Sequence, residues 1–502
     1  MGIYFIFIIG VALMFVRRSN ASPESFFLGK RGLGPWVSAL SAEASDMSGW
    51  LLMGLPGLAY WMGLSEAFWT AIGLAAGTYI NWKIVARRLR VYTELAHNSF
   101  TLPSFFSNRF HDKKHILLVI SSIMIILFFS IYVGAQFVTF GKLFNSLFGV
   151  PEYYTQIVIG GAALVFLYTL LGGFLGESFT DLVQGLLMIA AIVLVFVCGI
   201  TAAGGFGAVR DKLSSFPRFL DIFGTAAPQA GTAQSFGPGA DYPRLSIIST
   251  LAWGLGYFGM PQVLLRFMAI KSPERLPKAR VIAVSWCCIS LFAAVAIGII
   301  GRAWSPALYT DGGASELIFL DMARRFFPPI LAGLVLSGIL GASMSSADSY
   351  MLITASSVAN DLLKNSIKKN ISEKSVLWIA RVTMLVVTLF GLFVALSGSD
   401  SIFRIVSYAW AGLGACFGPL ILFSLFWKRT TLAGAAAGML SGGIIVVLWK
   451  NVISHLSPVL NVYELLPAFV ISSAVIVLVS LATAKPSSEI EAEFNEAKKL
   501  CA

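Results

Sequence analysis

The chain has 502 residues, of which 57% are hydrophobic and only 12% are charged, whereas a typical soluble domain carries roughly 25% charged residues. This composition excludes a soluble globular protein and predicts an all-α integral membrane protein. The net charge of +11 does not require a nucleic-acid partner, because most Lys and Arg residues fall in connections on one side of the predicted membrane and therefore set its orientation.

Apolar runs long enough to cross a bilayer, which takes about 20 helical residues, divide the chain into about thirteen predicted spans. The first, residues 1 to 16, ends in two arginines without a small-residue cleavage site, so we interpret it as a retained helix and not as a signal peptide. The other spans are expected near residues 34 to 62, 65 to 86, 115 to 144, 153 to 175, 178 to 201, 245 to 270, 279 to 303, 327 to 361, 375 to 397, 402 to 426, 431 to 450 and 464 to 484.

These spans make one transmembrane domain over residues 1 to 485, followed by a tail over 486 to 502 that is predicted to form a short surface helix. The charge distribution places the N-terminus outside and the tail in the cytoplasm. Oligomeric state does not follow from the sequence. Membrane lipid is the surrounding partner that the composition requires.

Two blocks of five spans are expected, over about 34 to 201 and 245 to 426, with extra helices at 1 to 16, 431 to 450 and 464 to 484. Residues 202 to 244 separate the blocks and are rich in Gly, Pro and Ala, which predicts a mobile surface loop. Because five is odd, the two blocks cross the membrane in opposite directions. That is the arrangement of an inverted-repeat transporter.

Each block opens with an interrupted span. The second span contains "SDMSG" at residues 45 to 49, and the seventh contains "WGLGYFGMPQ" at 253 to 262. Glycine and proline at this depth free backbone groups that lipid cannot satisfy, so such breaks are tolerated around a cavity. Broken segments at corresponding positions of two halves indicate a central binding site between them.

Asp46 lies in the first break, beside Ser48 and Gly49. A carboxylate at the centre of a membrane costs about 3 kcal/mol on insertion scales, so it normally faces a cavity, a cation or a partner. We favour that interpretation over a structural acid satisfied by backbone amides of the break. Glu43, one turn earlier, is equally compatible with a capping or an ion-paired role.

The ninth span carries a polar cluster in "LSGILGASMSSADSYMLITASS". A lone serine in a span usually returns a hydrogen bond to its own helix, but five polar side chains around an acid are harder to explain in that way. Hydroxyls and freed carbonyls are oxygen ligands for a hard monovalent cation. The cluster comprises Ser343, Ser345, Ser346, Asp348 and Ser349.

Aromatic residues accompany the second break. Trp253, Tyr257 and Pro261 follow one another at single-turn spacing, among glycines that would let a small solute approach the backbone. Tyr132, in the fourth span, is a candidate to face them. Asp181, near the start of the sixth span, is either a helix N-terminal acid stabilised by the helix dipole or part of an ion path.

No nucleotide-binding fingerprint or catalytic triad accompanies these features, and neither cysteine nor histidine spacing suggests a disulfide or transition-metal site. An enzyme and an organic cofactor are therefore not expected. Uphill transport would draw on an ion gradient.

Several long stretches resemble the sodium/solute symporter family, and within it the bacterial members that carry proline. They are "SDMSGWLLMGLPG", "INWKIVARRLRVYTE", "LYTLLGGFLGESFTDLVQ", "WGLGYFGMPQVLLRFMA" and "VSYAWAGLGACFGPLILFSLFWKR". The resemblance implies a leucine-transporter-type fold of thirteen helices, built as a 5+5 inverted repeat with broken helices 2 and 7. It also implies uptake of L-proline with Na+ across the bacterial plasma membrane.

Carried over by position, the resemblance assigns roles to residues of this sequence. The implied sodium ligands are the carbonyls of Ala44, Met47 and Ala342 and the hydroxyls of Ser345 and Ser346. The implied solute residues are Ser48, Gly49, Tyr132, Trp253, Tyr257 and Pro261. A second sodium or an ion path is a further hypothesis, with Asp46, Asp181, Asp348 and Ser349 as its residues.

Two departures weaken the choice of solute. The best-studied proline-carrying members have Gln-Pro-His where this chain has Met260 to Gln262, and a threonine at Ser346, which keeps the hydroxyl. Sodium symport of alanine, pantothenate or a sugar acid therefore stays open as an alternative.

Overall fold

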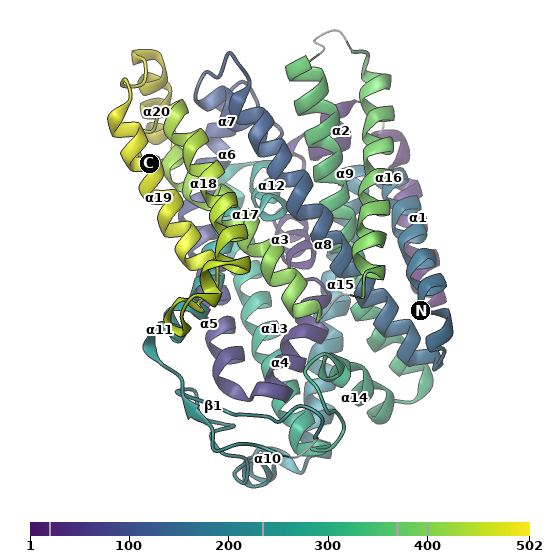
Figure 1. Ribbon diagram of the computed structural model, residues 1–502. Coiled ribbons are helices and arrows are strands. Elements are labelled where there is room, and N and C mark those ends of the chain that lie inside the picture. The colour runs from purple at the N-terminus through teal and green to yellow at the C-terminus, as the bar shows by residue number, and fades with distance from the viewer. Residues whose placement is uncertain (20–21, 233–234, 368–370, 399–400, 502) are drawn as a thin grey trace.

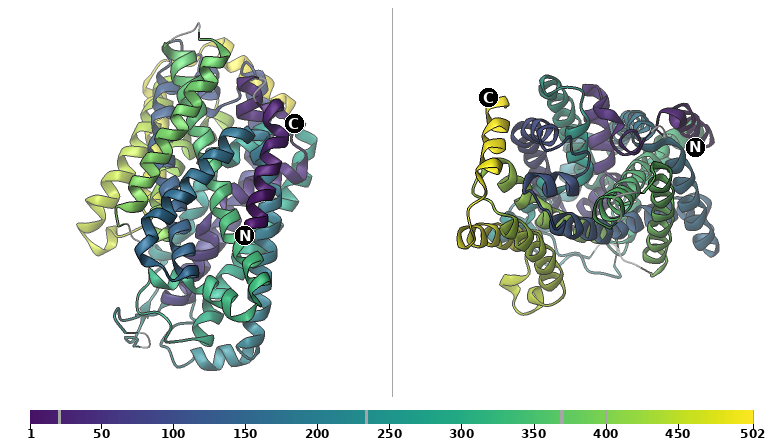
Figure 2. Two further views of the ribbon diagram at one scale, coloured as in Figure 1. Left: turned by 90° about the vertical axis from the view of Figure 1, so that its right-hand side faces the viewer. Right: turned by 90° about the horizontal axis from the view of Figure 1, so that it is seen from above.

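A computed structural model describes residues 1–19, 22–232, 235–367, 371–398 and 401–501. The remaining positions belong to predicted connections and to the last residue of the predicted tail, and lie outside the described residues. Among the described residues, eight helices are long and apolar enough to cross a membrane. The helices run roughly along one long axis (Figures 1 and 2).

The α-helices are α1 (Gly2–Ser19), α2 (Pro23–Leu28), α3 (Pro35–Asp46), α4 (Leu55–Met62), α5 (Leu64–Ile80), α6 (Ala86–Leu95), α7 (Leu102–Arg109), α8 (Ile116–Phe148), α9 (Tyr154–Ala202), α10 (Gly205–Leu213), α11 (Arg244–Leu251), α12 (Pro261–Ala269), α13 (Leu276–Trp304), α14 (Ile318–Phe326), α15 (Pro329–Ser356), α16 (Glu373–Leu396), α17 (Ile402–Phe426), α18 (Leu432–Asn451), α19 (Leu465–Ala482) and α20 (Ser488–Leu500). Two short strands, β1 (Gly224–Thr225) and β2 (Ala240–Asp241), pair antiparallel with Gly224 opposite Asp241.

Tighter or wider helical turns join them. They are η1 (Gly29–Arg31), η2 (Trp50–Gly54), η3 (Asn81–Val85), η4 (Pro151–Tyr153), η5 (Ala252–Gly259), η6 (Pro273–Arg275), η7 (Ala314–Leu317), η8 (Ser357–Ile367), η9 (Ile453–His455) and η10 (Pro458–Leu460).

The two ends of the bundle differ. We call the end with α10, β1 and β2 the loop end, and the end with α20 the tail end; they lie at the bottom and top of Figure 1. The predicted loop over 202 to 244 is not free of regular structure, because it contains α10 and the β1–β2 pair. It also packs on the bundle, since Trp69 Nε1 donates to the carbonyl of Ile222 over 2.8 Å.

The predicted spans match the observed helices closely, with one merger. The fifth and sixth spans form the single element α9, which reverses at Gly173 (φ 53°, ψ −170°). Both ends of α9 lie near α14: Arg324 donates to the carbonyl of Ser146, in the last turn of α8 that precedes α9, and Gly199 near the end of α9 lies against Met322. A left-handed φ is readily adopted by glycine, so this one residue replaces a connecting loop.

The first predicted break is a real interruption. Helix α3 ends at Asp46, Met47 leaves helical geometry (φ −80°, ψ 63°), and the chain resumes through the wide π-type turn η2 before α4. Such turns leave carbonyls without their usual partners. The break therefore supplies backbone acceptors inside the protein.

The second predicted break is built differently. After α11 the chain tightens into the 3₁₀ turns of η5, becomes extended at Met260 (φ −78°, ψ 106°) and starts α12 at Pro261. Proline suits the first position of a helix because its missing N–H has no helical acceptor there. A side chain at Gly259 would meet the backbone N of Gly418 at 2.6 Å, so η5 packs directly on α17.

Helices α7 and α14 were not predicted. Both are short, with eight and nine residues, and so fall below the length that a spanning segment needs. Helix α14 buries its apolar face at the loop end and carries Arg324 and Arg325 in its last turn.

Candidate functional site

The first break and helix α15 meet through predicted ligand atoms. Ser345 Oγ donates to the carbonyl of Ala44 over 2.8 Å and lies 3.2 Å from the carbonyl of Ala342. Tyr350 OH donates to the carbonyl of Ser45 over 3.1 Å. Three of the five predicted sodium residues thus lie together, one from α3 and two from α15.

This cluster is shielded from water and rich in oxygen. Ala44, Ala342, Ser345 and Ser346 are 0% exposed and Met47 is 2% exposed. Ser346 Oγ has no hydrogen-bond partner among the described residues. A buried hydroxyl without a partner is costly, and a bound cation would offset that cost. Carbonyl and hydroxyl oxygens are the donor set that hard cations prefer.

The two breaks touch each other through Asp46. Gln262 Nε2, in the first turn of α12, donates to Asp46 Oδ1 over 3.0 Å. Gln262 belongs to the triplet, Met260 to Gln262, in which the chain differs from the best-studied proline-carrying members. Glu43 is also buried and accepts from Trp82 Nε1 over 3.4 Å.

Ser48 and Gly49 face α8. The backbone N–H of Gly49 donates to Gln136 Oε1 over 3.3 Å. A Cβ at Gly49 would lie 2.5 Å from Thr139 Oγ1, so only glycine allows this close approach. Ser48 Oγ accepts from the N–H of Trp50, which fixes the start of η2.

Two of the predicted aromatic residues, Trp253 and Tyr257, share Trp410 as a neighbour, and each predicted aromatic residue also has contacts of its own. Trp253 packs against Trp50, Phe403 and Tyr463, with ring centroids 5.5, 5.4 and 5.0 Å apart. Tyr257 packs edge-on against Trp410 at 5.1 Å. Tyr132 lies against Tyr350 of α15 at 4.4 Å, close to the first break. We call Trp50, Trp253, Phe403 and Tyr463 the aromatic layer.

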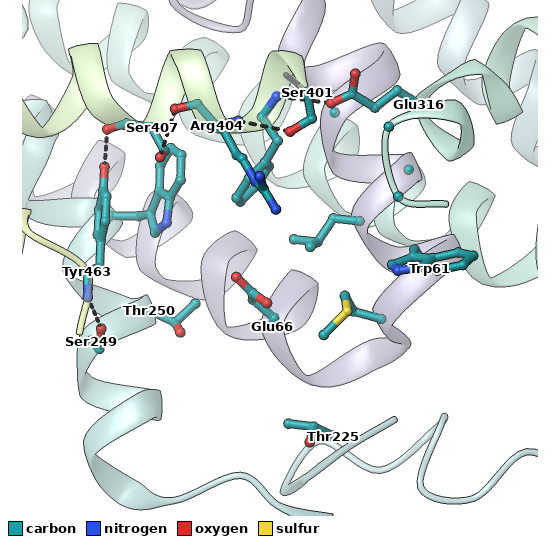
Figure 3. Close-up of a pocket in the computed structure, with 18 of the residues that line it drawn as sticks. Trp61, Glu66, Thr225, Ser249, Thr250, Glu316, Ser401, Arg404, Ser407 and Tyr463 are labelled. Carbon is teal, nitrogen blue, oxygen red and sulfur yellow. Dashed lines mark hydrogen bonds between the residues drawn. The ribbon is translucent and has the colours of Figure 1, made fainter. Parts of the chain in front are cut away.

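A cavity of about 1090 Å³ lies on the loop-end side of this layer. Figure 3 shows Tyr463, Glu66 and Arg404 around it. Of the predicted solute residues, Trp253 lines this cavity. Ser48, Tyr132 and Tyr257 are at most 1% exposed, so the aromatic layer separates them from the cavity in this conformation.

A second buried polar cluster lies between the first break and the tail end, around Arg266 of α12. Its Nη2 donates to Glu177 Oε1, to Asp181 Oδ2 over 3.1 Å and to Ser349 Oγ over 2.9 Å. Its Nε donates to Ser41 Oγ over 2.9 Å, and Ser41 Oγ donates to Asp181 Oδ2 over 2.7 Å.

Asp181 therefore forms an ion pair with Arg266. It lies two turns beyond the reversal at Gly173 and so is not at a helix terminus. Asp348 lies on the far side of the same cluster, where it accepts from Tyr168 OH and from the N–H of Ser349 over 2.7 Å. Asp181 and Ser349 thus share Arg266 as a partner, and Asp348 adjoins Ser349. Asp46 is instead engaged by Gln262 of the second break.

Several residues of this site were missed by sequence reasoning. Arg266 and Glu177 each carry a charge inside an apolar span, and a charge of one sign in one span calls for an opposite charge in another. That rule could have paired them. Gln136, Tyr350 and Trp410 carry no such signal, because polar and aromatic residues are frequent in spans without a site.

Comparisons with known proteins identify the family of the chain. A family model described as "Sodium:solute symporter family" matches residues 26–442. The chain is 40% identical over 504 residues to proteins named "Sodium/proline symporter" from Staphylococcus aureus strains USA300 / TCH1516 and NCTC 8325 / PS 47, covering 99% of this chain and 95% of each relative.

Solved structures share the fold. A Na+-coupled sialic acid symporter in a substrate-bound outward-open state matches with a TM-score of 0.76 at 18% identity, over 96% of this chain and 97% of that chain. MhsT in complex with L-phenylalanine matches with a TM-score of 0.55 at 15% identity, over 89% and 98%. The fold is therefore of the leucine-transporter type, as predicted.

Proposed function

Because the chain belongs to the sodium:solute symporter family, we propose that it takes up L-proline together with Na+ across the bacterial plasma membrane. The observation that carries the choice of proline is the 40% identity to sodium/proline symporters over 99% of the chain. The oxygen cluster where α3 ends against α15 supports a sodium site in this chain.

Sodium is proposed to bind the carbonyls of Ala44, Met47 and Ala342 and the hydroxyls of Ser345 and Ser346. This site joins α3 to α15, because its ligands come from both helices. Occupancy would therefore hold the first break in one arrangement. Asp46 adds negative charge nearby without being a direct ligand in this scheme.

Proline is proposed to bind between the two breaks. Ser48 and Gly49 would face the polar part of the solute, and Tyr132, Trp253, Tyr257 and Pro261 would border its ring. The contact between Gln262 and Asp46 crosses the same space. Solute binding there would act on both breaks at once, which is a direct route to coupling with sodium.

Transport is proposed to proceed by alternating access. The cavity at the loop end is the entry path, so the loop end faces outward and α20 faces the cytoplasm, as the basic residues indicate. Each Na+ entering down a potential of 100 mV contributes about 2.3 kcal/mol. One sodium is enough for substantial accumulation of solute.

A second sodium at Asp181, Asp348 and Ser349 is a further hypothesis. The positively charged guanidinium of Arg266 already contacts Asp181 and Ser349. A second sodium there requires Arg266 to move. A sodium-activation curve with a Hill coefficient near one, unchanged in Asp181→Asn, would exclude it. The same residues can alternatively serve as an ion path.

The test of the proposed function is uptake of radiolabelled proline into proteoliposomes with an imposed Na+ gradient. We expect uptake that saturates with proline and collapses when K+ replaces Na+. Competition with unlabelled alanine, pantothenate and a sugar acid decides among the alternative solutes. Equal uptake without Na+ refutes sodium coupling, and stronger competition by another solute refutes the choice of proline.

A further inference from the structure

Helices α3 and α12 are fastened to each other toward the tail end. Ser38 Oγ donates to the carbonyl of Arg266 over 2.9 Å. The backbone of Leu33 pairs with Ala269 and Lys271 over 3.1 and 2.9 Å. These contacts join the segment before the first break to the segment after the second, so the two segments behave as one unit.

Helices α9 and α15 form the opposing unit. Tyr168 on the first half of α9 bonds Asp348 of α15, and Ser349 Oγ donates to Glu177 on the second half. Gly338 of α15 lies so close to α9 that a Cβ there would meet Ala191 Cβ at 2.9 Å. The packing leaves little freedom between these two helices.

Arg266 is the charged link between the two units. Its guanidinium, carried by α12, contacts Glu177 and Asp181 of α9 and Ser349 of α15. The side chains of Arg266 and Asp181 are 0% exposed and that of Glu177 is 3% exposed. Ser41 of α3 adds a hydrogen bond to Asp181.

The acids of this cluster are incompletely satisfied. Asp181 Oδ1 and Glu177 Oε2 are buried without a hydrogen-bond partner among the described residues. Two carboxylates therefore compete for one guanidinium in a medium of low dielectric. Such a contact is strong while closed, yet water and ions that enter on opening would stabilise the separated groups.

We propose that Arg266 is the tail-end gate of the transporter: its ion pairs with Glu177 and Asp181 close the path from the sodium site to the tail end and break when that path opens. This inference rests on the proposed function, because it assumes alternating access. The gate and the predicted sodium site join the same two units, since Ala44 lies on α3 and Ser345 on α15. Arg266 acts as a positioning residue and not as a ligand.

A purely structural ion pair would give a different result in one variant. Arg266→Gln alone leaves buried acids without their cation and risks misfolding. The double variant Arg266→Gln with Glu177→Gln removes one charge of each sign but still takes the cation away from Asp181. A structural role therefore predicts a less stable protein whose tail-end path stays as closed as in the parent. A gate predicts a folded protein whose tail-end path opens more often.

The experiment measures cysteine accessibility from each side of the membrane. In a chain whose five native cysteines are replaced by alanine, Leu40→Cys is the reporter, because Leu40 is 2% exposed and faces Gly185 across the α3–α9 interface. Oriented membrane vesicles are treated with a membrane-impermeant maleimide in Na+-free buffer. Ser480→Cys, buried at the tail end between α18 and α19, reports general loosening.

We expect labelling of Leu40→Cys from the tail side to rise at least fivefold in the double variant and to fall back when Na+ is added. Labelling of Ser480→Cys should not change. Parent-like labelling of Leu40→Cys in the folded double variant overturns the proposal, and so does an equal rise at Ser480→Cys. Proline uptake by the parent is measured in the same vesicles. If the parent shows no proline uptake, the proposed function is refuted, whereas the labelling of Leu40→Cys still tests whether Arg266 closes the tail end.

Discussion

The loop end and the tail end of this protein hold their charged residues in different ways. At the loop end, Lys142 pairs with Glu316 over 2.6 Å beside a cavity of about 1090 Å³, and the lysine side chain is 22% exposed. Toward the tail end, the side chains of Arg266 and Asp181 pair at 3.1 Å with no exposure.

The difference has a physical meaning for transport. A charge beside water costs little to separate from its partner, whereas a buried pair resists separation until water enters. The described structure therefore has a cavity beside the charged pair at one end and buried charged groups at the other. The four predictions that follow test whether burial decides the strength of each contact.

The largest effect is expected for Glu177→Ala at the buried end. The change breaks one of the two buried ion pairs of Arg266 and leaves the pair with Asp181. Breaking a buried pair by removing one partner typically costs about 3–5 kcal/mol. The free energy of unfolding in an SDS titration measures this loss, with the exposed Glu152→Ala as control. A loss below about 1 kcal/mol would mean that the buried pair contributes little.

A smaller loss is expected for Glu316→Gln at the loop end. Glu316 accepts from Lys142 Nζ and from the backbone N–H groups of Ile402 and Phe403, both over 3.1 Å. Hydrogen bonds to a charged group contribute about 1.5–3 kcal/mol each, but the lysine partner stays near water, so we expect about 2 kcal/mol in total. Glu66→Gln, which lines the same cavity, is the matched control. A loss as large as that of Glu177→Ala would remove the difference between the ends.

The sodium site lies between the two ends and is tested by Ser345→Ala. Losing one oxygen ligand should raise the half-saturating Na+ concentration about tenfold, which corresponds to about 1.4 kcal/mol. Stabilisation of the melting temperature by NaCl relative to KCl should shrink accordingly. Ser337→Ala removes a hydroxyl from the same helix, where it bonds only one turn back to Gly333, and should leave the Na+ response unchanged. An unaltered response in Ser345→Ala would place the ion elsewhere.

The smallest effect is expected for surface pairs at either end. Lys450 lies 3.8 Å from Glu464 and its side chain is 47% exposed, while Lys428 lies 3.6 Å from Glu491 and is 57% exposed. Both lysine side chains lie largely in water, although the Glu464 side chain is only 4% exposed. Pairs with such an exposed partner contribute at most about 1 kcal/mol. Lys450→Ala and Lys428→Ala should therefore match each other in thermal unfolding. A clear difference between their melting temperatures would show that the contribution of an ion pair depends on its position along the membrane axis as well as on its burial.

Much of the architecture follows from periodic and compositional patterns. The predicted spans coincide with helices such as α8, α13 and α17, because about 20 apolar residues can satisfy their backbone in lipid only as a helix. Gly49 indicated the first break, after α3, and Pro261 with the glycines before it indicated the second, before α12. Short helices such as α14 escaped prediction because their burial comes from tertiary packing and not from length.

Local sequence also placed the polar candidates but not their partners. Asp46, Asp181 and the serines of α15 stand out because polar groups are rare in spans. The pattern did not show which partner each acid meets. Asp181 forms an ion pair with Arg266 of α12, and Asp46 accepts a hydrogen bond from Gln262, at separations of 85 and 216 residues.

By itself the sequence determined that this chain spans a membrane many times, where its helices break, which residues carry buried polarity and which family it resembles. Each of these depends on local composition and spacing along one segment. Only the tertiary structure decided that Ser345 meets Ala44, that Arg266 lies between two acids, and that Trp253 lines the cavity while the other predicted solute residues are buried. Those contacts join segments distant in the chain, and their geometry arises from how the helices pack.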